Sequence, residues 1–330
     1  MLILNSSKSY FLHYLSFIQS IVVRYAENKC VANHFYFMDD DLLDLKVLSS
    51  IPLPYAFRLW RKVTSKRKWI LSSCSELWVS TPYLAKKYAA WHPRLIRPVV
   101  SGPLLERNWL SSQDCVSKPY FQRSVVHSSS LSTTLTSLVK TTSSPTSGVV
   151  RICYHGTWSH RDDMKWFAPI ICEVQRLCSE VHFDVIGDAR VARIFKKVPR
   201  ITVLDTMPWP DYLSYTQNNR FDIGVAPLLD TLFNRGRGPI KFFDYARCGA
   251  VGVYSSGPAF ESFVTDGVDG FVLKNDQQLW IDTLVKLVRS PELRASMYEA
   301  AWQKVLANST ESPEIQAYLE DLREHIKSLE

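Results

Sequence analysis

Residues 221–256 constrain the fold more than any other part of the chain. Their sequence, FDIGVAPLLDTLFNRGRGPIKFFDYARCGAVGVYSS, holds an apolar run at 221–227, a polar glycine-bearing loop at 234–238, a helical stretch that opens at Pro239, and a second apolar run at 250–254. Two apolar runs joined by a loop and a helix are typical of neighbouring parallel strands that are buried on both faces. The segment therefore predicts a strand–loop–helix–strand unit of an α/β sheet.

The N-terminus of this predicted helix is suited to bind a phosphate. The first amides of a helix that begins at Pro239 lack intrahelical partners, and the helix dipole adds positive potential there. Arg235, Arg237 and Lys241 are expected to surround the same anion. Asp244, one turn into the helix, is placed to accept hydrogen bonds from a ribose diol, so a nucleotide diphosphate fits the arrangement. The alternative is that Asp244 only complements the helix dipole and that the arginines are solvated loop charges.

This segment resembles the donor-nucleotide signature of GT-B-type glycosyltransferases related to bacterial family 4, also called group 1. The positions that fall on the signature are Asp222, Pro227, Phe233, Asn234, Arg235, Ile240, Lys241, Tyr245, Gly249 and Ser255. A second stretch, FESFVTDGVDGFVL at 260–273, matches another motif of the family. The resemblance covers residues 150–300.

Three positions depart from the family pattern. Many members carry two glutamates around the donor sugar, where this chain has Gly236 and Asp244. Arg237 stands in place of the usual lysine before the helix, and Ala-Val-Gly at 250–252 replaces Pro-Val-Val. The loss of the first glutamate bears on catalysis, whereas the change at 250–252 affects strand packing.

The resemblance implies an α/β protein with the GT-B fold, in which two Rossmann-like domains with doubly wound parallel sheets face a cleft. It implies a hexosyltransferase-like enzyme that moves a sugar from a nucleotide-diphosphate sugar to a saccharide, lipid-linked or protein acceptor. Retention of the anomeric configuration is expected, as is a reaction without a metal or other cofactor. The rival hypothesis is a catalytically inactive nucleotide-sugar-binding or scaffold protein on the same fold, because a fold does not guarantee activity.

The resemblance also assigns the site residues. The predicted catalytic residues are Arg235, Lys241 and His160. The predicted nucleotide-sugar-binding residues are Gly156, Arg161, Met207, Pro208, Asn234, Arg237, Gly238, Pro239, Ile240 and Asp244.

Two of these assignments have structural alternatives. The turn YHGTWSHRDDM (154–164) faces the donor diphosphate in the family, but His160 fits a surface position beside the helix equally well, and Asp162 is expected to cap that helix. The loop TMPWPDY (206–212) lies where the family binds the base, with Trp209 placed to stack on it. Its prolines fit a merely stiffened turn as well.

The chain divides into two unequal parts around a polar segment. Residues 124–148 contain 15 Ser/Thr in 25 positions, which is typical of a linker or a surface insertion. We therefore expect an acceptor-side domain at 1–123 and a nucleotide-sugar-binding domain at 149–330. No glycine-rich loop stands near the start, so the N-terminal domain is expected to be reduced relative to the family.

The C-terminal part alternates strand and helix patterns in a regular way. Strands are predicted at 149–156, 181–188 and 200–205, with helices at 162–179 and 189–197 between them, and amphipathic helices from about 276 to 328 close the chain. Ligands of such sheets bind beyond the carboxyl ends of the strands. The turns at these ends should therefore converge on one crevice.

Charge is distributed unevenly along the chain. Residues 1–148 hold 18 Lys/Arg and 8 Asp/Glu, a net +10, whereas residues 149–330 hold 21 and 24, a net −3. Within the basic part, RLWRKVTSKRKWIL (58–71) interleaves basic and apolar residues, which suits either an anionic membrane surface or a solvated helix whose aromatic residues pack inward. No nucleic-acid-binding motif accompanies the charge, so a nucleic-acid partner is not expected.

Three consecutive acids follow a predicted strand at 34–38. Asp39, Asp40 and Asp41 are expected to line the acceptor side of the cleft, since side chains at a strand's carboxyl end face the crevice. The alternatives are a helix cap and a divalent-metal site like the Asp-x-Asp of GT-A glycosyltransferases.

Cysteine content and hydropathy indicate the compartment. Seven cysteines without paired short spacings argue against a disulfide framework and a zinc site. The most apolar stretch, 11–23, is interrupted by polar residues and lacks the flanks of a secretory signal. The expected location is the cytoplasm, with peripheral contact to the inner face of the membrane.

Overall fold

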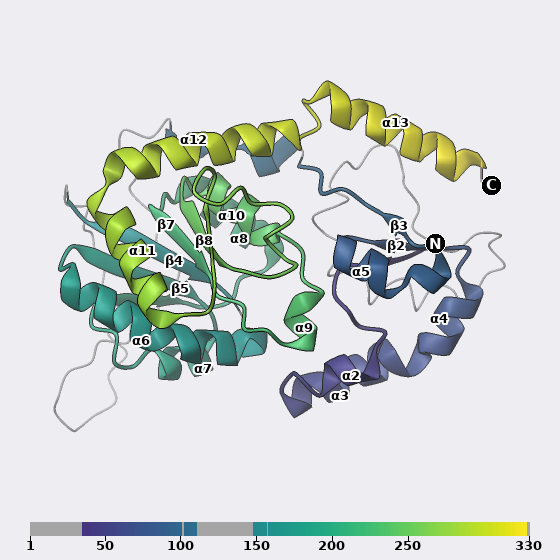
Figure 1. The fold of residues 1–330 in the computed structure, drawn as a ribbon, viewed down its shortest axis with the longest axis horizontal. Coiled ribbons are helices and arrows are strands. Elements are labelled where there is room, and N and C mark those ends of the chain that lie inside the picture. The colour runs from purple at the N-terminus through teal and green to yellow at the C-terminus, as the bar shows by residue number, and fades with distance from the viewer. Residues whose placement is uncertain (1–34, 101, 111–147, 157, 329–330) are drawn as a thin grey trace.

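The computed structural model describes residues 35–100, 102–110, 148–156 and 158–328. Within these ranges the chain forms two parallel sheets, one in each half, and each sheet has its own hydrophobic core (Figure 1). The apolar stretch 11–23 lies outside the described residues, as does 124–148 except for its last residue. The predicted α/β architecture with a smaller N-terminal sheet is confirmed.

The N-terminal sheet has three strands in the order β1-β2-β3, all parallel. β1 is fully buried because its four residues, FYFM, are all apolar or aromatic. The strands are β1 (Phe35–Met38), β2 (Glu76–Val79) and β3 (Arg94–Leu95), and the helices are α2 (Leu45–Leu48), α3 (Leu53–Lys62), α4 (Arg67–Ser73) and α5 (Pro82–Lys87). Short 3-10 turns lie at Thr64–Lys66, Ala89–Trp91, Gly102–Leu105 and Asn108–Leu110.

The C-terminal sheet has six parallel strands in the order β6-β5-β4-β7-β8-β9. The chain runs outward from β4 in one direction and from β7 in the other, so the point of reversal lies between these two central strands. Crevices at such reversals are the usual ligand sites of open α/β sheets. The strands are β4 (Val150–His155), β5 (Val181–Ile186), β6 (Ile201–Leu204), β7 (Ile223–Ala226), β8 (Val251–Ser255) and β9 (Phe271–Leu273).

Helices cover both faces of this larger sheet, because its strands are apolar on both sides. One core joins the sheet to α6 and α11, and a second joins it to α10 and α12. The helices are α6 (Arg161–Leu177), α7 (Ala189–Ile194), α8 (Trp209–Asn218), α9 (Leu232–Arg235), α10 (Ile240–Arg247), α11 (Gln277–Arg289), α12 (Pro291–Ala307) and α13 (Pro313–Ser328). A further 3-10 turn lies at Trp158–His160.

The last helix returns to the N-terminal sheet. Leu322 of α13 is buried in a cluster with Phe35, Trp78 and Ile96, and Nε2 of His325 lies 2.9 Å from a carboxylate oxygen of Glu76. Figure 1 shows α12 lying over the larger sheet and α13 continuing past the smaller one. The C-terminal segment therefore links the two halves of the molecule.

Element boundaries differ from the predicted ones mainly in the N-terminal half. The apolar stretch RLIRPVV (94–100) forms only the two-residue strand β3, and Ile96, Arg97 and Pro98 after it line a cavity. Within the described ranges, no helix is long and apolar enough to cross a membrane.

Candidate active site

The glycine-bearing loop and α10 lie beyond the carboxyl end of β7, at the reversal point of the larger sheet. The loop is partly helical, because Thr231 caps a short helix α9 by accepting a hydrogen bond from the amide of Asn234 at 3.1 Å. Pro239 then occupies the N-cap position of α10. Among the described residues no side chain caps the first amides of α10, so they are available to an anion.

The acidic loop after β1 packs directly against the glycine-bearing loop. A Cβ atom on Gly236 would lie 2.8 Å from Cβ of Asp41 and 3.0 Å from its amide nitrogen. A Cβ atom on Gly238 would lie 3.6 Å from Oδ1 of Asp39. The approach of Asp41 leaves little room for a side chain at position 236, where the resemblance led us to expect a glutamate.

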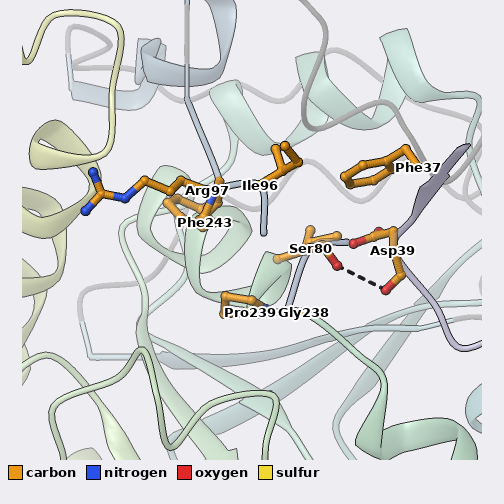
Figure 2. A pocket seen from close by; sticks show the side chains of 10 residues that line it. Phe37, Asp39, Ser80, Ile96, Arg97, Gly238, Pro239 and Phe243 are labelled. Atoms are coloured by element: carbon orange, nitrogen blue, oxygen red, sulfur yellow. Dashed lines mark hydrogen bonds between the residues drawn. The ribbon is translucent and has the colours of Figure 1, made fainter. Parts of the chain in front are cut away.

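A small cavity lies where the two loops meet (Figure 2). It has a volume of about 30 Å³, the room of about one or two waters. Its lining comes from both halves of the molecule: Phe37, Asp39, Ser80, Ile96, Arg97, Pro98, Gly238, Pro239, Ile240 and Phe243. Figure 2 shows Asp39 and Ser80 on one side of it, facing Gly238 and Pro239 of the α10 loop.

The three acids of the loop have three different environments. Asp41 is fully buried and accepts hydrogen bonds from Nζ of Lys87 and from the hydroxyl of Tyr88. Asp40 lies 3.6 Å from Nε of Arg237. Asp39 borders the cavity, and burial, together with the charge of Asp40, raises its pKa to about 6. In the described part of the chain, no group of three or more metal-binding side chains forms a metal site.

Arg237 is the cation that faces these acids. Its guanidinium packs over the ring of Phe233 at 4.6 Å, and its Nε atom is buried without a hydrogen-bond partner among the described residues. Burial alone would lower its pKa, but the carboxylates around it, Asp40 foremost, raise the pKa overall. Arg237 is therefore a charged, incompletely bonded donor between the two halves.

Lys241 and Asp244 lie in a buried polar cluster at the start of α10. Oδ1 of Asp244 accepts a hydrogen bond from Nη2 of Arg247 at 2.8 Å, and its Oδ2 lies 3.9 Å from Nζ of Lys241. Nε of Arg247 donates to the hydroxyl of Thr216 at 2.8 Å. Burial lowers the pKa of Lys241, and the neighbouring charge of Arg237 adds to the effect.

His155 belongs to the same region and was not predicted. Its Nδ1 lies 2.9 Å from the hydroxyl of Tyr212, and its Nε2 has no partner among the described residues although it is buried. Burial lowers the pKa of His155 to about 3, so the imidazole is neutral at physiological pH. The signal in the sequence was its place at the carboxyl end of β4, next to Gly156.

His160 is held by an acid that the sequence analysis did not single out. Its Nδ1 lies 2.9 Å from Oδ2 of Asp163, which is buried and also accepts hydrogen bonds from the amide of Leu229 and from Nδ2 of Asn234. Asp163 thus ties the start of α6 to the glycine-bearing loop. Burial lowers the pKa of His160, and the nearby Arg237 contributes. A neutral imidazole that donates to Asp163 offers an acceptor at Nε2, not a positive charge.

Arg235 and Arg161 do not join the cluster around Lys241. Arg235 makes two hydrogen bonds to exposed Asp230, at 2.6 and 2.8 Å, and the neighbours that influence its pKa are Asp230 and Tyr83. It lines a separate, open cavity of about 410 Å³ beside α9. Arg161 pairs with Asp162 at 2.9 Å. In this structure the guanidinium of Arg235 is directed to Asp230, and a role for Arg235 at the anion that Arg237 and Lys241 are expected to surround stays a prediction.

The remaining predicted residues take structural positions beside the crevice. A side chain at Gly156 would collide with the ring of Tyr154, and Pro208 occupies the N-cap position of α8 while Met207 packs on the core beneath that helix. Asp162 is exposed and does not cap α6, whose N-cap position is His160. The prediction of Asp162 as a cap is wrong because its carboxylate bonds to Arg161.

Comparison with known proteins agrees with this geometry. Residues 150–290 match the sequence model of a family described as glycosyl transferases group 1. Solved structures match over most of the chain. The chain has the GT-B glycosyltransferase fold. The resemblance inferred from the donor signature is therefore confirmed for the C-terminal half.

Three of the matched structures illustrate the likeness. HepE of Anabaena, solved in complex with UDP and glucose, is 13% identical with a TM-score of 0.56, and the match covers 94% of this chain and 76% of HepE. WaaG, a glycosyltransferase of lipopolysaccharide biosynthesis, is 11% identical with a TM-score of 0.56, and the match covers 90% of this chain and 80% of WaaG. The pneumococcal O-GlcNAc transferase GtfA, in complex with UDP and GlcNAc, is 12% identical with a TM-score of 0.52, and the match covers 80% of this chain and 48% of GtfA.

The chain spans about half the length of some of these structures, 48% of GtfA and 46% of TarM. No curated protein matches the sequence significantly.

Proposed function

We propose that the protein is a glycosyltransferase that moves a sugar from a nucleotide-diphosphate sugar to a saccharide, lipid-linked or protein acceptor. The observation that carries this proposal is the uncapped N-terminus of α10, with Lys241 and Arg237 beside it, facing the acidic loop that follows β1. Positive groups on one side and acids on the other suit a phosphate leaving group and a hydroxyl acceptor, respectively. HepE and GtfA were both solved with UDP, which makes UDP the first nucleotide to test.

In this proposal the donor diphosphate binds at the first amides of α10. Lys241 and Arg237 stabilise the negative charge that develops on the diphosphate as the sugar leaves, so the protein supplies the positive charge without a metal. Half-buried Lys241, whose pKa is lowered, gains a favourable charge partner when the anion enters. Asp244, beside Lys241, accepts hydrogen bonds from the ribose.

The acceptor lies on the other side of the crevice in this proposal. Asp39 borders the shared cavity together with Gly238 of the α10 loop, which supports a position of its carboxylate near the reacting centre in this proposal. Retention of configuration, a role in polysaccharide biosynthesis and a cytoplasmic location with peripheral membrane contact belong to the same proposal.

One observation favours the alternative, a catalytically inactive nucleotide-sugar-binding or scaffold protein. Gly236 replaces an acid of the family's donor-sugar site, and Asp41 fills the space where that side chain would begin. The cavity that remains between the loops is small. Binding of a nucleotide sugar without turnover would follow from this arrangement.

Hydrolysis of UDP- and GDP-sugars separates the two. A transferase slowly passes its sugar to water, so release of UDP or GDP in the absence of an acceptor supports the proposed activity, and its persistence with excess chelator supports metal independence. A thermal shift with a nucleotide sugar and no turnover over hours would instead indicate the inactive binder.

A further inference from the structure

Helix α3 carries an apolar stripe that no other described element covers. Leu53, Phe57 and Trp60 are spaced i, i+4 and i+7, which places them on one face of the helix. They are 84%, 63% and 43% exposed, and the rings of Phe57 and Trp60 stack at 5.9 Å. Scattered exposed apolar residues are ordinary, but three on one helical face form a patch that indicates a contact surface.

A neighbouring face of α3 accounts for its attachment to the protein. Ala56 is buried, and Tyr55 packs edge-on against Phe233 of α9 at 6.2 Å. Leu59 is half-buried against the same core. Figure 1 shows α2 and α3 along one edge of the molecule, beyond α9. The stripe is therefore additional to the face that the fold requires.

The charge around the stripe identifies its partner. Residues 45–75 contain seven Lys/Arg and no Asp or Glu. Arg58, Arg61 and Lys62 on α3 itself are exposed, as is Lys68 on α4. An apolar stripe rimmed by basic side chains on a helix fits the interface of an anionic lipid bilayer, where aromatic and aliphatic groups enter the headgroup region and the cations meet lipid phosphates.

We infer that α3 is a membrane-docking helix that binds anionic bilayers through Leu53, Phe57 and Trp60, with Arg61 and Lys62 contacting the headgroups. This assignment changes which residues of the predicted membrane-surface segment, 58–71, contact the bilayer. Leu59 and Ile70 pack inward, and the inserting residues begin before that segment, at Leu53. The inference deepens the peripheral membrane contact of the proposed function, and its test does not depend on catalytic activity.

Vesicle flotation tests the inference with the full chain. Extruded vesicles of phosphatidylcholine alone and with 30 mol% phosphatidylglycerol serve as probes. We expect binding to the anionic vesicles at 0.1 M salt and little binding to the neutral ones. The double variant Phe57→Ser/Trp60→Ser should bind the anionic vesicles at least tenfold more weakly, because it removes the apolar area that enters the bilayer. The double variant Arg61→Glu/Lys62→Glu should also bind at least tenfold more weakly, since each charge near the membrane surface changes partitioning about fivefold.

Matched controls come from the C-terminal half. Leu279→Ser on α11 removes another exposed apolar side chain (41% exposed), and Lys196→Glu/Lys197→Glu reverses two other exposed charges. Both controls should bind like wild type. Melting temperature and UDP titration check folding and donor binding in every variant, and the single variant Leu53→Ser replaces the first double variant if that one fails to fold.

Three results would overturn the inference. Equal binding to neutral and anionic vesicles would remove the role of the basic rim, and wild-type binding by the Phe57/Trp60 variant would remove the role of the stripe. Absence of vesicle binding together with a dimer in light scattering, lost in that variant, would assign the stripe to a second copy of the chain.

Discussion

Asp244 and Arg247 form a buried ion pair one turn apart on α10, with Oδ1 of the acid 2.8 Å from Nη2 of the arginine. Arg247 is among the most deeply buried side chains of the molecule, and its Nε atom donates to Thr216. The predicted ribose-binding acid is thus held in place by the protein itself. Its second oxygen lies 3.9 Å from Nζ of Lys241, at the N-terminal end of the same helix.

Replacing Arg247 with methionine should destabilise the fold by about 3–5 kcal/mol, because the buried carboxylate of Asp244 would lose the guanidinium that donates to its Oδ1. The double variant Asp244→Asn/Arg247→Met should recover a large part of this loss. Urea unfolding of the wild type and the two variants measures both effects. A cost below about 1 kcal/mol for Arg247→Met would show that water reaches the pair.

The ribose role of Asp244 is tested with UDP and its 2′-deoxy analogue. Wild type should prefer UDP, and Asp244→Ala should lose that preference, because the carboxylate would no longer accept hydrogen bonds from the ribose hydroxyls. Asp244→Glu, which restores the family's residue, should retain most of the preference. If wild type and Asp244→Ala discriminate equally between UDP and its 2′-deoxy analogue, Asp244 does not bind the ribose and serves only in the ion pair with Arg247.

Restoring the family's glutamate at position 236 should harm the protein. The Cβ atom of Gly236→Glu would meet Asp41 at 2.8 Å, so the loop must shift, at a cost of about 1–3 kcal/mol. Gly238→Ala is the matched control, because its Cβ atom would meet its nearest neighbour at an ordinary 3.6 Å. Chemical denaturation compares the two. Gly236→Glu with unchanged stability and faster turnover would show that the loop adapts readily.

Asp39 should make stability depend on pH between about 4 and 7. Burial and the neighbouring Asp40 raise its pKa from 3.8 to about 6, so the folded state holds the proton more tightly than the unfolded state. The stabilisation that the protonated carboxyl of Asp39 gives the folded state is fully present below about pH 4 and is lost as pH rises through about 6. Wild type therefore loses stability as pH rises, whereas Asp39→Asn does not. The free energy of unfolding of Asp39→Asn minus that of wild type should increase by up to about 3 kcal/mol over this range. A difference that does not change with pH would contradict the shift.

The sequence predicted the parts of this structure that depend on local pattern. Apolar runs and helical spacing located β4, α6, β5 and the unit from β7 to β8, because burial on both faces leaves a continuous apolar signature. The donor signature placed Lys241 and Asp244 in the helix after the glycine-bearing loop, where α10 lies.

The parts that the sequence did not reveal depend on contacts between distant segments. Arg235 and Arg237 are two residues apart with the same charge, but only the fold shows that one faces Asp230 and the other faces Asp40. The burial of Arg247 beside Thr216 and the hydrogen bond between Asp163 and Asn234 likewise arise from packing between segments that are distant in the sequence. The return of α13 to the N-terminal sheet rests on Leu322, which looks like any apolar helix residue in the sequence.

The central claim is that a donor diphosphate binds at the N-terminus of α10. Isothermal titration of UDP and of uridine into wild type, Lys241→Ala and Arg235→Ala tests it most directly, because the difference between the two ligands isolates the diphosphate. Lys241→Ala should weaken UDP binding about tenfold or more, the value of one charge-assisted contact, and leave uridine binding unchanged. Arg235→Ala, whose guanidinium is directed to Asp230, should change UDP affinity less than twofold. Equal UDP affinity in wild type and Lys241→Ala would place the diphosphate elsewhere and contradict the account.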